Sequence, residues 1–107
     1  MVVAITSLGK NMTDKVDQHF GRCPFFVFYD TESQTIEVVP NPHQKVVSRA
    51  GFASVLLLLS HGASKIIAGE IGIKAKQHLD KHHIQIIIPP PEKTIEEIIE
   101  LIKASEH

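Results

Sequence analysis

The feature that most constrains this chain is the alternation of short apolar runs with helical segments in its C-terminal half. Residues 65–68 and 84–88 are mostly apolar and β-branched, as strands covered on both faces are. Residues 73–82 between them have a weak helical periodicity, and residues 49–60 before them also predict a helix. Strands joined through helices need crossover connections, so they run parallel in one sheet. The chain is therefore predicted to be an α/β protein.

The N-terminal half contains strands of a different kind. Residues 2–5 form one more short apolar run, and the polar residues 6–18 after it predict a loop. Residues 25–29 are aromatic and β-branched, and apolar and polar residues alternate in 35–39. Because only the short polar segment 30–34 separates these two strands, they are predicted to form an antiparallel hairpin.

Capping signals mark the ends of the predicted helices. Ser48 is the expected N-cap of the helix at 49–60, and Gly62 is expected to end it. Thr94 and Glu97 have the spacing of a capping box at the start of the last helix. The apolar stripe of that helix has helical spacing and consists of Ile95, Ile98, Ile99 and Ile102.

The element order β-β-β-α-β-α-β-α predicts five strands and three helices. A central first strand gives the sheet order 3-2-1-4-5, with strand 2 antiparallel, and a ligand crevice between strands 1 and 4, where the connections diverge. Strand 2 then begins beside the end of strand 1. Residues 19–23, 41–47 and 69–72 are thus expected beside Ser7 and Leu8, at one end of the sheet that we call the rim.

Length, charge and cysteine content restrict the class of protein. We expect a single domain over residues 1–107. The formal charge of −1 gives no general attraction to nucleic acid or to a membrane, and no apolar run is long enough to span a bilayer. The single cysteine cannot form an internal disulfide, and residues 2–5 are too short for a signal peptide. We therefore expect a cytoplasmic protein.

The candidate site is the segment around His19 and Cys23. An imidazole and a thiolate suit copper, zinc, iron–sulfur or molybdenum–sulfur species. Gly21 allows a ligand to approach the backbone closely, and Arg22 would lower the pKa of the thiol and attract an anion. The same residues also fit a structural role, with a partly buried cysteine at the strand end and a histidine bonded to the loop backbone.

Other rim residues are weaker candidates. His43 is either a third ligand or a solvated side chain. Gly69 and Gly72 precede a helix whose N-terminus could bind an anion, although helix packing requires such glycines equally. Glu70 is the one carboxylate clearly expected at the rim, so acid–base catalysis is not indicated, and a closed zinc site would need more strong ligands.

Residues 16–30, "VDQHFGRCPFFVFYD", and 66–75, "IIAGEIGIKA", resemble the two markers of the dinitrogenase iron-molybdenum cofactor-binding family. "EVVPNP" and "TIEEIIE" also fall where the family has comparable segments. The resemblance implies a ribonuclease H-like fold and the binding or shuttling of a metal–sulfur cluster, of the molybdenum–iron or molybdenum–copper type. It also implies that His19 contacts the cluster; at the position of Cys23, some carriers have cysteine and many stand-alone members have alanine.

Two departures from the family pattern concern cluster binding. The stretch after the Asn-Pro pair, residues 43–51, keeps one histidine and one glycine, and Glu70 stands where glycine is common. A carboxylate there would repel an anionic cluster unless Arg22 or a lysine neutralised it.

We therefore expect a non-enzymatic protein that binds, stores or delivers a metal–sulfur cluster, which the isolated protein need not contain. The expected metal ligands are His19 and Cys23, and the further cluster-binding residues are Gly21, Arg22, His43, Gly69 and Gly72. A cluster donor or acceptor protein is the expected partner, and the chain is expected to be a monomer or a weak homodimer. Two alternatives stay open: an interaction module without metal, and a redox sensor that uses Cys23 with a depressed thiol pKa.

Overall fold

The computed structural model describes residues 1–42 and 50–105. Their elements are, in chain order, β1 (Val2–Ser7), β2 (Phe25–Asp30), β3 (Thr35–Pro40), α1 (Ala50–Ser60), β4 (Ala63–Ile67), α2 (Ile73–Lys81), β5 (Gln85–Ile87) and α3 (Ile95–Ser105). All eight predicted elements are present, with ends that differ by a few residues. None of the helices in these ranges is long and apolar enough to cross a membrane.

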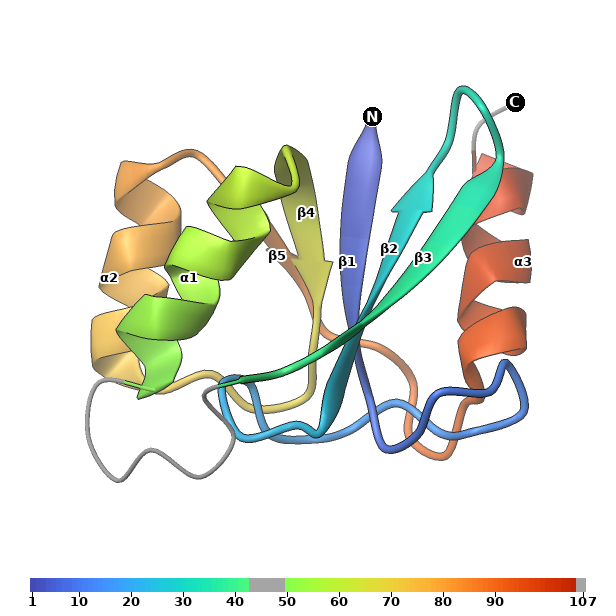
Figure 1. The fold of residues 1–107 in the computed structure, drawn as a ribbon, viewed down its shortest axis with the longest axis horizontal. Coiled ribbons are helices and arrows are strands. Elements are labelled where there is room, and N and C mark those ends of the chain that lie inside the picture. The colour runs from blue at the N-terminus through green and yellow to red at the C-terminus, as the bar shows by residue number, and fades with distance from the viewer. Residues whose placement is uncertain (43–49, 106–107) are drawn as a thin grey trace.

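The five strands form one mixed sheet in the order β3-β2-β1-β4-β5, which confirms the predicted topology. β2 runs antiparallel to both β1 and β3, whereas β4 is parallel to β1 and β5 is parallel to β4. Figure 1 shows α1 and α2 on one face of the sheet and α3 on the other. The molecule therefore has three layers.

Alternation along the central strands supplies a core on each face of the sheet. In β1, Ala4 faces the α1 and α2 side, and Val3 and Ile5 face α3. The cluster under α1 and α2 includes Phe26, Phe28, Val55, Leu58, Ile66 and Leu79. The cluster under α3 includes Val27, Tyr29, Ile67, Ile95, Ile98 and Ile99. Because both faces are covered, β1 is buried along nearly its whole length.

β1 is two residues longer than its apolar run, because Thr6 and Ser7 are buried polar residues whose hydroxyls have partners. The Thr6 hydroxyl donates to the carbonyl of Asp17 at 2.7 Å, and the Ser7 hydroxyl donates to the carbonyl of Gly9 at 2.5 Å. A strand can continue through such residues when their hydrogen bonds are satisfied.

The helix-end predictions are confirmed where the structure describes them. Gly62 ends α1 with a φ of +71°, in the left-handed region that favours glycine, and its N–H donates to the carbonyl of Leu59. In the capping box, the Thr94 N–H donates to Glu97 Oε1 at 3.1 Å, and the Glu97 N–H donates to Thr94 Oγ1 at 3.3 Å. Ser48 lies outside the described residues.

The loop between β1 and β2 crosses the rim, at the lower end of the sheet in Figure 1. Isolated β-bridges tie it to three elements. They pair Ser7 with Val16, Lys15 with Thr94, and His19 with Glu70. The loop thus joins the ends of β1 and β4 to the start of α3, and the predicted proximity of residues 19–23 to residues 69–72 is confirmed.

Candidate functional site

His19 lies at the rim with its imidazole ring between two carboxylates. Its Nδ1 is 3.4 Å from Asp17 Oδ1, and its Nε2 is 3.4 Å from Glu70 Oε2. The His19 side chain is 65% exposed and that of Glu70 74%, whereas that of Asp17 is only 10% exposed. We call this arrangement the Asp17–His19–Glu70 row. It holds an accessible imidazole at the rim, beside the ends of β1 and β4.

The inner end of the row is part of the backbone scaffold. Asp17 Oδ1 accepts a hydrogen bond from the backbone N–H of His19 at 2.9 Å, which closes a tight turn. The Asp17 N–H donates to the carbonyl of Thr6 at 3.0 Å, and the Thr6 hydroxyl returns a bond to the Asp17 carbonyl. Asp17 therefore ties His19 to the end of β1. Sequence reasoning missed this role of Asp17; an aspartate two residues before a loop histidine was the signal that could have found it.

The outer end of the row is held by pairing with the segment after β4. The N–H of Phe20 donates to the carbonyl of Glu70 at 3.0 Å, and the N–H of Glu70 donates to the carbonyl of Gln18. Gly69 makes this approach possible, because a Cβ built on it would lie 3.0 Å from Gln18 Cα. His19 and Glu70 are thus placed by backbone contacts rather than by their side chains alone.

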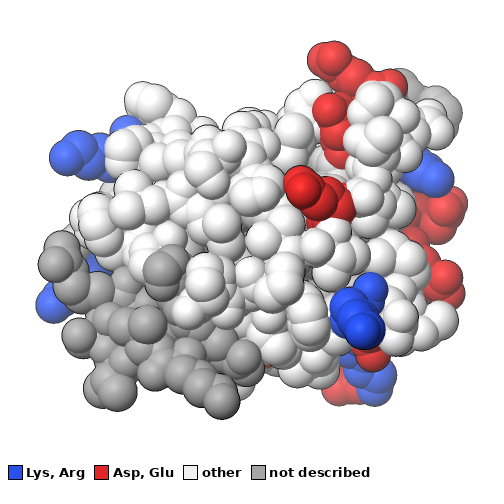
Figure 2. All heavy atoms as spheres, in the orientation of Figure 1, with Lys and Arg blue, Asp and Glu red and all other residues white. Residues whose placement is uncertain are grey.

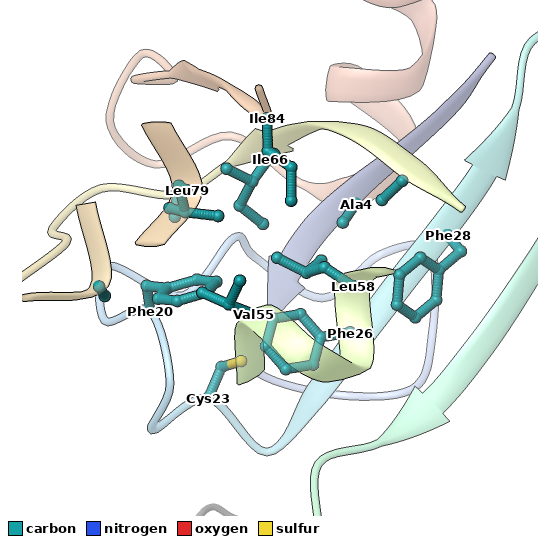
Figure 3. Packing of buried hydrophobic residues seen from close by; sticks show 13 residues of the cluster. Ala4, Phe20, Cys23, Phe26, Phe28, Val55, Leu58, Ile66, Leu79 and Ile84 are labelled. Carbon is teal, nitrogen blue, oxygen red and sulfur yellow. The ribbon is translucent and has the colours of Figure 1, made fainter. Parts of the chain in front are cut away.

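Cys23 points away from this row and into the core. Its side chain is wholly buried in the cluster under α1 and α2, and Figure 3 shows it beside Phe20, Phe26 and Val55. Burial, and secondarily the charge of Asp17, raises the pKa of the Cys23 thiol to about 12. The expectation that Arg22 lowers this pKa is therefore wrong, because the burial of the sulfur dominates.

The structure thus separates the two side chains predicted to be metal ligands. His19 faces solvent and Cys23 faces apolar side chains, which is the structural role left open for the cysteine. A neutral thiol sealed in a core is neither a metal ligand nor a reactive nucleophile in this conformation. Ligation by Cys23 stays a prediction that the described arrangement does not favour.

Gly21 and Asn41 shape the turn between His19 and Cys23. Gly21 has a φ of +90°, a conformation that other residues rarely adopt. The buried Asn41 amide donates to the carbonyls of Gly21 at 3.0 Å and Cys23 at 2.9 Å, and the Asn41 N–H donates to the Pro24 carbonyl at 2.9 Å. Sequence reasoning missed this contribution of Asn41 as well. The hairpin register carried the signal, because it places residue 41 next to Pro24.

The remaining predicted contacts are placed as follows. Arg22 is exposed in the loop before β2, and His43 lies outside the described residues. Gly72 is the N-cap of α2 in an extended conformation, and a Cβ built on it would meet nothing within 4 Å. The space around Gly69 is therefore tight, whereas the space around Gly72 is open.

Two surface hollows flank the row. Asp17, Gln18 and His19 line a hollow of about 250 Å³ together with Lys15 and Glu92. Glu70 lines a larger, open groove of about 910 Å³ on the other side, toward α2 and β5. In the part of the chain that the structure describes, no group of three or more His, Cys, Asp or Glu residues could hold a metal ion.

The charges near the smaller hollow are largely balanced. Lys15 pairs with Glu92, and this contact holds the pKa of the Glu92 carboxyl below its usual value. The face of the molecule over α1 and β3 carries only scattered charged side chains, most of them near its margins (Figure 2). Neither positive nor negative side chains dominate that face, in line with the formal charge of −1.

Comparison with known proteins gives a consistent result. The family model described as dinitrogenase iron-molybdenum cofactor matches residues 1–105. The apo form of the orange protein from Desulfovibrio gigas is 26% identical, with a TM-score of 0.89, covering 98% of this chain and 88% of that chain. A NifB-like protein from Thermotoga is 30% identical, with a TM-score of 0.82, covering 96% of this chain and 87% of that chain. No curated protein sequence matches.

Proposed function

Because this chain belongs to the dinitrogenase iron-molybdenum cofactor family, we propose that it carries a metal–sulfur cluster as cargo and catalyses no reaction on it. The family match over residues 1–105 and the similarity to the orange protein support a role connected with a metal cluster. The finer proposal is a molybdenum-containing sulfide cluster with iron or copper, which the protein stores or delivers to an acceptor protein.

The observation that carries this proposal is the exposed imidazole of His19 at the rim, beside the ends of β1 and β4. Asp17 stands at Nδ1 of this ring, as a carboxylate does in many metal sites, where it orients the histidine and leaves Nε2 for the metal. We assign Nε2 of His19 as the contact with a metal atom of the cluster. Imidazole nitrogen is a suitable ligand for copper and iron.

The donor set suits a cargo that brings most of its own ligands. Cys23 is buried, so His19 is the soft or borderline donor that the described rim presents to solvent. A sulfide cluster already satisfies most coordination positions of its metals, and one or two protein bonds are then enough to hold it. Such sparse ligation also allows release, which delivery to an acceptor requires.

The surroundings of His19 support a binding role more than a catalytic one. Cys23 and His19 cannot act together as nucleophile and base. The Cys23 thiol is directed into the core, and its pKa is raised to about 12. The same burial argues against the alternative of a redox sensor, which needs an accessible thiol of lowered pKa.

Anaerobic reconstitution tests the proposal. The protein is mixed with copper(I) and tetrathiomolybdate, passed through gel filtration, and examined for retained metal and charge-transfer absorption. We expect the native chain to retain the cluster and His19→Ala to bind it roughly tenfold or more weakly. His82→Ala, which removes an exposed histidine at the far end of α2, is the matched control and is expected to bind normally.

Two results would contradict the carrier function: a native chain that retains no cluster under any of these conditions, or a His19→Ala variant that retains as much as the native chain. A parallel reconstitution with iron(II), sulfide and molybdate separates the two cluster types.

A further inference from the structure

The outer half of the Asp17–His19–Glu70 row has the dimensions of a pair of metal ligands. His19 Nε2 and Glu70 Oε2 are 3.4 Å apart. Two ligands on one tetrahedral ion, each bonded at roughly 2.0–2.1 Å, are about 3.3–3.4 Å from each other. The separation in the structure is thus the one that a single bound metal atom would require. The backbone bridge between His19 and Glu70 keeps the two side chains next to each other before any metal arrives.

The His19 ring has a carboxylate at each nitrogen. Because a carboxylate only accepts hydrogen bonds, Asp17 Oδ1 and Glu70 Oε2, each 3.4 Å from its ring nitrogen, both favour a proton on the nitrogen that they face. A metal ion that displaces the proton from Nε2, while Nδ1 keeps its proton toward Asp17, meets two unprotonated donors, Nε2 and Oε2. These two atoms can then bind the same cation.

We propose that Glu70 is a second protein ligand, which together with His19 Nε2 binds a cationic metal atom of intermediate softness such as Zn²⁺, Cu²⁺ or Fe²⁺. This inference rests on the proposed carrier function and names the ligand set of its site. Imidazole nitrogen with carboxylate oxygen suits these metals, and the open positions are filled by water or by the ligands of the cargo. Glu70 then selects a cargo that presents a metal atom rather than an anionic sulfide face to the rim.

A purely structural role for the same contact makes the opposite prediction. If Glu70 only forms an ion pair with His19, it competes with a metal for the ring, and removing its charge frees Nε2. Metal affinity would then stay the same or rise in Glu70→Gln. If Glu70 is a ligand, metal affinity falls, because one of the two protein bonds and one negative charge are lost.

Zn²⁺ alone is the probe, so the test needs no cluster. Histidine side chains are labelled with ¹⁵N, and Zn²⁺ binding is followed at the His19 ring nitrogens, which separates this site from the other six histidines. We expect Glu70→Gln to weaken binding at His19 roughly tenfold or more. Glu100→Gln, which removes one exposed carboxylate from α3, is expected to bind Zn²⁺ at His19 as the native chain does. Thermal unfolding checks that both variants are folded.

Undiminished or stronger Zn²⁺ binding at His19 in Glu70→Gln would overturn the proposal, and so would a native His19 that does not respond to Zn²⁺ at all. Failure of the carrier function has a different signature. The native chain could bind Zn²⁺ through His19 and Glu70 and still retain no sulfide cluster. That result would support the His19–Glu70 metal site and contradict the carrier function.

Discussion

Gly69 packs directly against Gln18: a Cβ on Gly69 would overlap the Gln18 side-chain amide and would lie 3.0 Å from Gln18 Cα. This contact brings the segment after β4 next to the segment that carries His19. The hydrogen bonds between residues 18–20 and Glu70 depend on it. Gly69 is therefore the packing residue on which the geometry of the rim depends most directly.

Replacing Gly69 with alanine is expected to push the two segments apart. The methyl group meets backbone as well as a side chain, so we expect a loss of about 1–3 kcal/mol in the free energy of unfolding. Gly72→Ala is the matched control, because the space there is open and the residue has a negative φ. It should stay within about 0.5 kcal/mol of the native chain by urea denaturation. Equal effects of the two substitutions would refute the packing argument.

Asn41 is expected to be important for the turn that separates His19 from Cys23. Asn41→Ala leaves the carbonyls of Gly21 and Cys23 without their amide donor, at an expected cost of about 1–3 kcal/mol. Hydrogen exchange at residues 21–23 should accelerate more than exchange in α3, which lies on the other face of the sheet. Uniform acceleration over the whole chain would show only a global loss of stability.

The Cys23 thiol is expected to be almost inert in the folded protein. With a pKa of about 12, its thiolate fraction near neutral pH is roughly three orders of magnitude below that of a free cysteine, and burial slows reaction further. Alkylation by iodoacetamide should therefore require unfolding and should become fast in denaturant. Fast alkylation of the native chain, at the rate of a small thiol, would contradict the buried placement.

The same shift predicts how stability changes in alkaline solution. The folded pKa of Cys23 is raised from 9.0 to about 12, so its contribution is fully present below pH 9 and is lost as pH rises from 9 toward 12. Cys23→Ala should show a weaker decline of Tm across this interval than the native chain. A decline of identical steepness in both proteins would exclude Cys23 as its cause.

The capping box of α3 predicts an effect in acid. Hydrogen bonds from Thr94 hold the pKa of the Glu97 carboxyl below its ordinary value of 4.5, so this stabilisation is present above pH 4.5 and is lost as pH falls below it. Glu97→Gln should therefore flatten the decline of Tm in acid. Thr94→Ala should cost about 1 kcal/mol near neutral pH. If the Tm of Glu97→Gln fell in acid as steeply as the Tm of the native chain, the capping box would not be the cause of the decline.

The fold could be predicted because its determinants are local and repeat along the chain. The alternation of short apolar runs with helices requires parallel crossovers for β4 and β5, and the short polar link after β2 requires a hairpin. Thr94 and Glu97 marked the start of α3 for the same reason, since a capping box lies within four residues. These features together led to the order β3-β2-β1-β4-β5.

The site could be predicted only as far as the backbone path determines it. Topology brought His19 to Glu70, but it did not determine which way Cys23 points. Residues 17–24 are irregular, so no period of two or 3.6 assigns their side chains to a face. Gly21, which lies between His19 and Cys23, also has a positive φ that the sequence pattern does not predict. The role of Asn41 also depends on a contact between segments distant in sequence.

The position of the metal in the loaded protein tests the account most directly. Crystals of the chain reconstituted with copper and tetrathiomolybdate would be measured at the absorption edges of both metals, and the anomalous density would locate each metal atom. We predict a metal atom at bonding distance, roughly 2.0–2.1 Å, from His19 Nε2, with Cys23 still in the core. A fully occupied cluster bound elsewhere, with His19 Nε2 unligated, would contradict it.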